Sequence, residues 1–203
     1  MSAPGHPETL WLASRSAARA AVLRGAGVAF ETVDAGVDED LVKAGLTGRG
    51  AAPREVAHVL AEEKAKTASL RCDGLVIGAD QTLDLDGELV DKSPDVGAAR
   101  LRLLSLRGRR HQLHSGLALA RAGELVFTTV DTSTLSVRRF SDSWLDGYIA
   151  RNSEAVLSSV GAYQLESEGV QLFDAIEGDF FSILGLPLLT LLAALRREGQ
   201  VAA

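Results

Sequence analysis

The stretch from Asp73 to Pro94, DGLVIGADQTLDLDGELVDKSP, constrains the fold more than any other part of the chain. It opens with the apolar run Leu75–Ile77, whose length and β-branched content predict a buried strand that stops at Asp80. The pair Asp86-Gly87 predicts a tight hairpin turn, after which the chain returns through Leu89-Val90. A carboxylate at the end of a buried strand is where α/β proteins bind ligands.

The predicted hairpin brings Lys92 back toward Asp80. An acid at a strand end with a lysine beside it suits metal-assisted phosphate chemistry. A strand cap with a surface salt bridge explains the same residues equally well. This stretch alone does not decide between the two interpretations.

A second candidate phosphate site lies near the N-terminus. The predicted first strand, Thr9–Ala13, runs into a helix whose candidate N-caps are Ser14 and Ser16. Arg15 and Arg19 are four residues apart and therefore share one face of the helix start. Free N–H groups, the helix dipole and two arginines together favour an anion. A capped helix with solvated arginines is the simpler alternative.

A third signal comes from a helix predicted to start at Pro53 and to run to about Ser69. Its apolar stripe includes Val56 and Leu60, and Lys64 follows in the same stripe. A lysine on an inward helix face either extends to the protein edge or meets an anion in a cleft. The region 35–52 before this helix, which contains Glu39, is expected to be an irregular loop.

The remaining segments predict an alternation of helices and strands. His111 and His114 are three apart on a predicted strand, so they face opposite sides and are expected to have structural roles. The expected elements are an extended stretch at Val28–Val33, a helix capped by Ser93 with Val96, Leu101 and Leu104 inward, strands at Arg110–Arg121 and Leu125–Arg139, a helix capped by Ser141, a short helix from Ser167 toward Ile176, a strand at Phe180–Leu184, and a helix with the stripe Leu188, Leu191, Leu192 and Leu195.

The 203 residues are expected to form one domain over 1–203, with 1–8 as a flexible tail. A net charge of −6 argues against backbone-led binding to nucleic acid or an anionic membrane. The single Cys72 excludes an internal disulfide and a cysteine-based zinc site. Neither a signal peptide nor a membrane span is predicted, so a cytoplasmic location is expected.

The order of these signals resembles the Maf family along nearly the whole chain. The motifs that carry the resemblance are LAS-x-S with Arg19, VDE (37–39), LAxEKA (60–65), VIGADQT (76–82), DGExxDKSP (86–94), LxSLxGRxH (101–111), SG (115–116), GAY (161–163) and IEGDFFSILGLPL (176–188). Maf proteins are nucleoside triphosphate pyrophosphatases, first described as septum-formation inhibitors. The resemblance implies an α/β fold of two lobes around a cleft, with a long, mixed, twisted sheet flanked by helices, and a homodimer.

The resemblance also implies roles for residues. Asp80 matches the catalytic acid, Glu39 matches a second carboxylate, and both would lie at a Mg²⁺ or Mn²⁺ ion. Lys64 and Lys92 match phosphate-facing lysines. The helix start, Ser14, Arg15, Ser16 and Arg19, matches the triphosphate-binding segment.

Three positions depart from the family pattern and bear on the choice of base. The usual SxSPRR is here SRSAAR, so Ala18 replaces an arginine; Gln81 and Glu166 replace the Thr and Gln of the dTTP/UTP branch. A glutamate only accepts hydrogen bonds, which favours a guanine-type base and the 7-methyl-GTP branch. The dTTP/UTP branch, a non-catalytic nucleotide-binding regulator of septation and, less favoured, a nucleic-acid binder are the alternatives.

Overall fold

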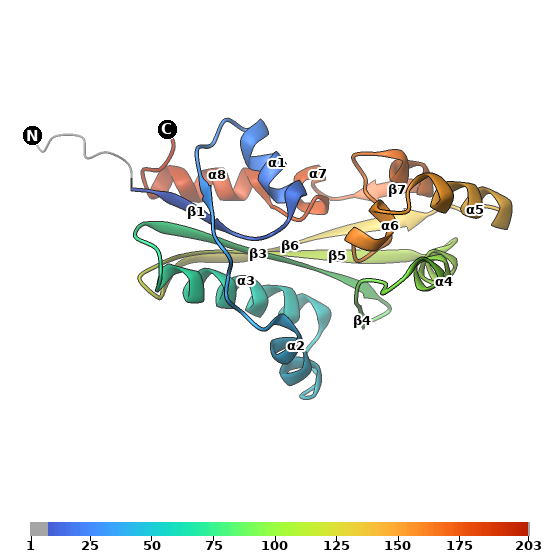
Figure 1. Cartoon of the computed structure of the whole chain (residues 1–203), viewed down its shortest axis with the longest axis horizontal. Helices are drawn as coiled ribbons and strands as arrows, with labels where there is room; N and C mark the ends of the chain where they lie inside the picture. Colours follow the sequence, from blue (N-terminus) through green and yellow to red (C-terminus); the bar gives the residue numbers. More distant parts are fainter. Residues whose placement is uncertain (1–7, 203) are drawn as a thin grey trace, which may run out of the picture.

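The computed structural model describes residues 8–202, and its organising element is one mixed seven-stranded sheet (Figure 1). The strand order is β2-β1-β3-β5-β6-β7, and β4 pairs with β3 outside this path. The strands β1 and β2 run parallel to their neighbours, and all other pairings are antiparallel. The strands are β1 (Leu10–Ala13), β2 (Glu31–Thr32), β3 (Leu75–Leu85), β4 (Glu88–Val90), β5 (Arg110–Arg121), β6 (Glu124–Val137) and β7 (Phe173–Glu177).

Helices cover both faces of this sheet. In Figure 1, α1 and α8 lie on one face and α3 lies on the other. Leu12, Ile77 and Leu119 pack with α1 and α8 in one core cluster, because alternate strand residues point to the same face. The helices are α1 (Ala17–Gly25), α2 (Glu39–Thr47), α3 (Pro53–Ser69), α4 (Val96–Leu106), α5 (Asp142–Arg151), α6 (Ala155–Ser158), α7 (Phe180–Ile183) and α8 (Leu188–Arg197), with a 3₁₀ turn at Glu168–Leu172.

The helix α3 lies unusually close to the sheet. A Cβ atom on Gly78 would come within 2.2 Å of the Ala61 carbonyl oxygen, and one on Gly116 within 2.2 Å of the Ala57 carbonyl oxygen. Only glycine permits this approach of helix to strand backbone. The alanines on the inward face of α3 are fully buried, so the predicted stripe and the predicted bounds of this helix are both confirmed.

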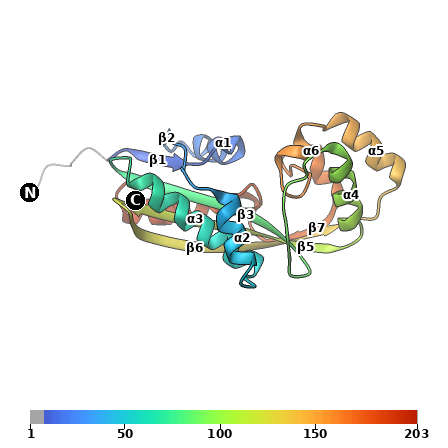
Figure 2. The same ribbon diagram turned by 60° about the horizontal axis from the view of Figure 1, so that its bottom comes forward.

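The last residues of β3 and β6 and the first residues of β5 lie side by side and form the sheet of a second lobe. The helices α4, α5 and α6 belong to this lobe (Figure 2). Its core contains Leu83, Leu103, Leu135 and the fully buried Tyr148. The two lobes therefore share long strands that run through both. The fold is α/β with a mixed sheet flanked by helices, as the sequence predicts.

Five local predictions are wrong, and the fifth, the strand end at Asp80, belongs to the cleft. The region 35–52 is not irregular, because α2 occupies Glu39–Thr47 and Asp38 caps it. Phe180–Leu184 is not a strand but the short helix α7, capped by Asp179. The chain before Ile176 is not a helix but a 3₁₀ turn followed by β7.

The fourth error concerns α4. Asp95 rather than Ser93 caps this helix, and Leu101 and Val96 are exposed instead of inward. The residues that α4 buries are Ala99, Leu103 and Leu106. The later cap shifts the start of the helix, and alanine contributes a buried position that a search for large apolar residues overlooks.

Residues 1–7 of the predicted tail lie outside the described residues. Glu8, the last residue of that prediction, accepts hydrogen bonds from Arg121 and from Gln200. Among the helices of residues 8–202, none combines the length and the apolar character needed to cross a bilayer.

Candidate active site

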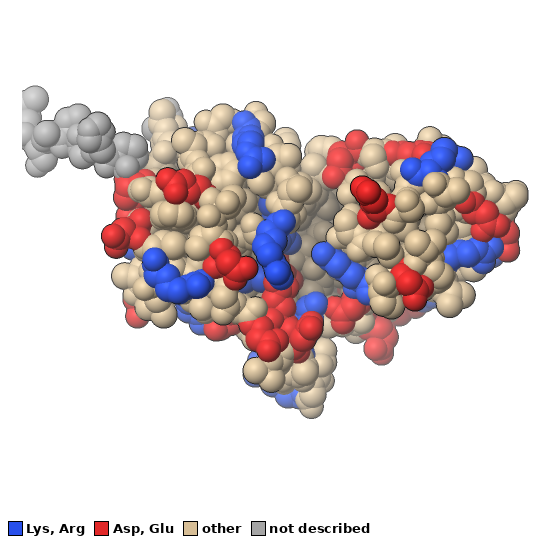
Figure 3. Space-filling view, in the orientation of Figure 1, with Lys and Arg blue, Asp and Glu red and all other residues tan. Residues whose placement is uncertain are grey.

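A cleft opens where β3 changes its neighbour on one side. The parallel strand β1 pairs with β3 only as far as Gly78, and the hairpin strand β4 pairs with it only from Leu83. Between Gly78 and Leu83, β3 pairs with β5 on one side and with no strand of residues 8–202 on the other, so that side is a free edge. A cavity of about 840 Å³ lies at this edge, and Figure 3 shows the hollow between the lobes with charged side chains along its sides.

Every candidate residue of the sequence analysis lines this one cavity. Their assigned roles stay predictions, but the fold brings all of them together from separate segments of the chain: Ser14, Arg15, Ser16, Ala18 and Arg19; Glu39; Lys64; Asp80 and Gln81; Lys92; and Glu166.

Asp80 does not end a strand, contrary to the sequence prediction, since β3 continues to Leu85. What ends near Asp80 is its parallel neighbour β1. Gly78, Asp80 and Thr82 alternate on the face toward α3, where the Thr82 hydroxyl donates to the Pro53 carbonyl at 2.8 Å. Because the glycines draw α3 onto the sheet, Asp80 meets a side chain of that helix directly.

That side chain is Lys64. Its Nζ lies 2.6 Å from Asp80 Oδ1 and 3.0 Å from Glu39 Oε1, so one ammonium joins two carboxylates from different elements. Lys64 is 5% exposed and Asp80 is 6% exposed. Burial alone would raise the pKa of Glu39, but the charge and hydrogen bond of Lys64, with smaller contributions from Lys43 and Arg19, lower that pKa. Glu39 is therefore ionised at neutral pH. We call Lys64, Asp80 and Glu39 the floor of the cleft.

The start of α1 forms the adjacent wall. Ser16 caps the helix by accepting from the Arg19 backbone N–H, while Ser14 Oγ accepts from Arg19 Nη1 at 3.1 Å. Arg19 Nε donates to the Gly185 carbonyl at 2.8 Å, which ties α1 to the turn between α7 and α8. Burial lowers the pKa of Arg19, and the charges of Asp80 and Glu39 oppose this. A guanidinium stays charged in this setting, so the wall is cationic.

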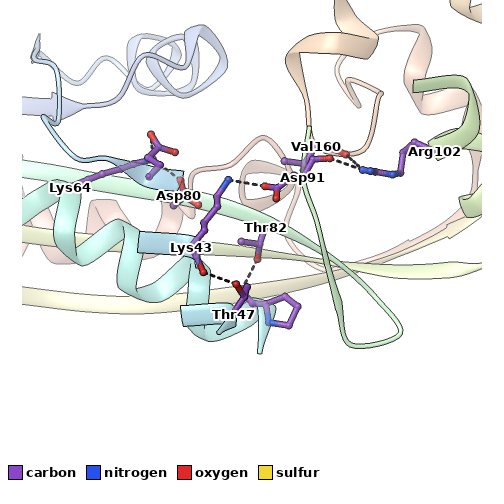
Figure 4. Close-up of polar contacts among 10 residues, drawn as sticks. Lys43, Thr47, Lys64, Asp80, Thr82, Asp91, Arg102 and Val160 are labelled. Carbon is purple, nitrogen blue, oxygen red and sulfur yellow. Dashed lines mark hydrogen bonds and ion pairs between the residues drawn. The ribbon is translucent and has the colours of Figure 1, made fainter. Parts of the chain in front are cut away.

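The outer edge of the cleft carries two further lysines. Lys92, which the sequence singles out, is exposed and forms no ion pair with any residue in the described part of the chain. Lys43 is not predicted from the sequence as a site residue. It extends from α2 and places its Nζ 2.8 Å from Asp91 Oδ1 (Figure 4). Lys43 and Asp91 also line the cavity. We call this ion pair the rim.

Two candidate residues for base selection, Gln81 and Glu166, also line the cavity. Glu166 is exposed at the cavity wall, close in sequence to the buried Tyr163. Gln81 Nε2 donates to the carbonyls of Ser182 and Ile183, both at 3.0 Å, so its amide group holds the chain at the end of α7. Two carbonyl partners fix the orientation of this amide. Gln81 therefore shapes the wall, while its role in reading a base stays a prediction.

The floor carries the donor set that a divalent cation would use. Asp80 and Glu39 both direct an oxygen at the Lys64 ammonium, so two carboxylates converge on one cationic position. Oxygen ligands suit Mg²⁺ and Mn²⁺, and Mg²⁺ is commonly held by one or two carboxylates together with substrate phosphates. Within residues 8–202 no group of three or more His, Cys, Asp or Glu side chains could enclose a metal by itself. The residues fit an ion that shares its coordination with phosphate and water.

The two histidines lie outside this cavity and have separate partners. His111 Nε2 lies 2.6 Å from the Tyr163 hydroxyl oxygen, and burial lowers the pKa of His111 to about 4. His114 contacts Thr132 and Asp84. Both are buried, and their contacts agree with structural roles.

Four arginines line a second, shallower hollow at the start of β5 and the end of β6, a grouping that the sequence does not predict. They are Arg109, Arg110, Arg138 and Arg139. Arg109 pairs with Asp86, and Arg110 pairs with Glu177 at 2.9 Å. Two of the four positive charges are thus compensated by carboxylates at the same surface.

The family-model match and the sequence relatives identify the family of this chain. The model described as "Maf-like protein" matches residues 9–198. A "Nucleoside triphosphate pyrophosphatase" of Caulobacter vibrioides is 58% identical over 94% of this chain and 96% of its own. A "7-methyl-GTP pyrophosphatase" of Rhizobium meliloti is 48% identical over 96% of this chain and 98% of its own. A solved dITP/XTP pyrophosphatase of Mycobacterium abscessus aligns with 94% of each chain at 18% identity and a TM-score of 0.39, too low for a comparison of sites.

Proposed function

The chain belongs to the Maf family, and on this premise we propose that it hydrolyses a nucleoside triphosphate to the monophosphate and pyrophosphate in the cleft between its lobes. Its relatives are named nucleoside triphosphate pyrophosphatases, and such enzymes are hydrolases that act on acid anhydrides. The observation that carries the proposal is the floor: two carboxylates that converge on one buried lysine, beside a cationic helix start.

In the proposed reaction, a water oxygen forms a bond to the α-phosphorus, and the bond from that phosphorus to the bridging oxygen breaks. The bridging oxygen leaves with its electron pair as part of pyrophosphate. The proton of the water goes to Asp80 or to Glu39, and the low pKa of Glu39 keeps that group in its accepting form. A Mg²⁺ or Mn²⁺ ion, when held by these two carboxylates, supplies charge neutralisation at the phosphates and activation of water.

The cations of this chain position the phosphates and offset their charge. Arg19 is held in place by Ser14 and by the Gly185 carbonyl, so its guanidinium is oriented before a ligand arrives. Arg15 and Lys92 line the same cavity and are exposed. Phosphoryl transfer depends chiefly on such positioning and charge stabilisation. The acidic net charge is no obstacle, since these cations gather locally.

For the base we propose 7-methyl-GTP or a related purine, with Glu166 at the wall as the acceptor of its N–H donors. A carboxylate accepts hydrogen bonds but does not donate them, and guanine-type bases offer N–H donors. The name of the Rhizobium meliloti relative supports this choice, while the name of the Caulobacter vibrioides relative leaves the base open.

The test is release of pyrophosphate by the purified protein with Mg²⁺ or Mn²⁺ from 7-methyl-GTP, GTP, ITP, dTTP, UTP and CTP. We expect 7-methyl-GTP to have the highest kcat/KM, and Glu166→Gln to reduce its preference over UTP by about tenfold, the loss of one good hydrogen bond. An unchanged preference in this variant would remove Glu166 from base selection. Absence of release from the whole panel would overturn the proposed activity and favour a nucleotide-binding protein.

A further inference from the structure

The rim differs from the floor in how easily its ion pair can separate. The side chains of Lys43 and Asp91 are 24% and 62% exposed, whereas those of Lys64 and Asp80 are 6% and 9% exposed. An exposed ion pair contributes little net free energy, because water solvates both charges when it opens. A buried pair cannot open without leaving a charge unsolvated. Asp91 is therefore the carboxylate that an incoming anion can displace.

Lys43 is placed to meet such an anion. It lies one helical turn after Glu39 on α2, so both side chains reach the same cavity. Burial alone would lower the pKa of Lys43, but the hydrogen bond and charge of Asp91, together with the charges of Asp80 and Glu39, raise it. The ammonium is thus charged at neutral pH and lies near the floor carboxylates.

The backbone of Asp91 is held independently of its side chain. Arg102 Nη1 of α4 donates to the Asp91 carbonyl at 2.8 Å and to the Val160 carbonyl at 3.0 Å, as Figure 4 shows. Val160 also lines the cavity. The Asp91 carboxylate can therefore rotate toward solvent while Arg102 keeps the chain around Lys92 in position.

From this arrangement we propose that Lys43 is a further phosphate-binding residue, which Asp91 holds in the free protein and which exchanges Asp91 for a phosphate of the nucleotide. The inference rests on the proposed function and names a binding residue for the same cleft. The two lysines then have different roles, since Lys64 remains with the floor carboxylates while Lys43 binds phosphate. Lys43→Gln therefore weakens binding of substrate and of pyrophosphate, while the chemical step is kept.

The test compares Lys43→Gln with Lys66→Gln, a matched change on α3 at a lysine that pairs with Glu63 away from the cavity. For the preferred nucleotide we expect Lys43→Gln to raise KM about tenfold with kcat within about threefold, which corresponds to about 1.4 kcal/mol of binding. Inhibition by inorganic pyrophosphate should weaken by a similar factor. Lys66→Gln should change neither constant.

A double-mutant cycle distinguishes exchange from a structural role of the pair. Asp91→Asn removes the competing carboxylate, so it should strengthen pyrophosphate inhibition about threefold in the wild-type background and not in the Lys43→Gln background. Equal weakening of binding by Asp91→Asn and Lys43→Gln would show that the pair is a structural link and overturn the inference. An unchanged KM in Lys43→Gln would also overturn it.

Calorimetric titration with inorganic pyrophosphate separates this inference from the proposed activity. If the wild type hydrolyses nucleotides but Lys43→Gln binds pyrophosphate normally, only the role of Lys43 fails. If the wild type hydrolyses none of the panel yet binds pyrophosphate through Lys43, the proposed activity fails and the anion site stands. If the wild type shows neither activity nor binding, both fail.

Discussion

The floor and the rim of the cleft each pair a lysine with aspartate, yet they are built differently. At the floor, Lys64 and Asp80 are enclosed by α3 and β3, and Glu39 adds a second carboxylate. At the rim, Lys43 and Asp91 join α2 to the segment after β4 in contact with solvent. The floor keeps its partners because separation would strand buried charges. The rim can exchange partners because water replaces the lost contact.

This difference assigns separate roles to the two pairs. A fixed pair suits a chemical step, in which groups must be oriented before the reaction begins. An exchangeable pair suits binding, since its lysine is released as the ligand arrives. Substitutions at the floor should therefore act on turnover or on folding, and substitutions at the rim should act on affinity.

The floor depends on the close approach of α3 to the sheet, and adding one methyl group tests this. Gly116→Ala places a Cβ atom against the Ala57 backbone, so α3 must shift. We expect the free energy of unfolding to fall by at least about 3 kcal/mol, which is the upper end of the range for overpacked cores. We also expect kcat to fall, because Lys64 moves away from Asp80. Urea unfolding and pyrophosphate release measure the two effects.

The control for this variant is Gly25→Ala at the end of α1, where an added Cβ meets no atom within 4 Å. This change should leave both stability and kcat near their wild-type values. If Gly116→Ala proved as stable and as active as this control, the close packing of α3 would not be what holds the floor together.

His111 provides a third buried group, which lies in the core like the floor but contacts an uncharged hydroxyl, that of Tyr163. Burial lowers its pKa to about 4 from an ordinary value near 6.5. The unfolded chain therefore binds the proton more readily, so stability is complete above about pH 6.5 and is lost as the pH falls toward 4. Between pH 7 and pH 5 this group alone should lower the free energy of unfolding by about 2 kcal/mol.

Urea unfolding at the two pH values measures this loss in the wild type and in His111→Gln. The variant is less stable throughout, but its pH dependence over this range should shrink by about 2 kcal/mol. His58→Gln, at a histidine on the outer side of α3 that contacts Thr128 and Glu62, provides the comparison. Equal pH dependence in the wild type and in His111→Gln would show that burial of this ring does not control acid stability.

The sequence predicts the parts of the site that depend on local pattern. The helix Pro53–Ser69 combines proline at its start with a regular stripe, so its bounds and the inward position of Lys64 both follow from 3.6-residue periodicity. The serine caps before α1 and α5 are equally local, since each depends on one hydroxyl and one nearby N–H.

The sequence does not predict features that depend on distant partners. The helix α2 is nine residues long and runs into glycines at 45, 48 and 50, which in the sequence indicate a loop rather than a helix that carries Lys43. Phe180–Ile183 resembles a strand by composition, but Asp179 caps it as a helix and Gln81 binds its end. The sequence predicts a strand end at Asp80 because the apolar run stops there. In the structure β3 continues past Asp80, and the strand that ends nearby is its neighbour β1.

The most direct test of this account makes the same substitution in both ion pairs and measures kcat and KM for the preferred nucleotide. Asp80→Asn should lower kcat by about a thousandfold, within the range for loss of a general base, while Asp91→Asn should keep kcat within about threefold and lower KM. Both aspartates line the same cavity, so the two substitutions compare groups of one site. If Asp91→Asn abolished turnover, or if Asp80→Asn kept it, the division between floor and rim would be wrong.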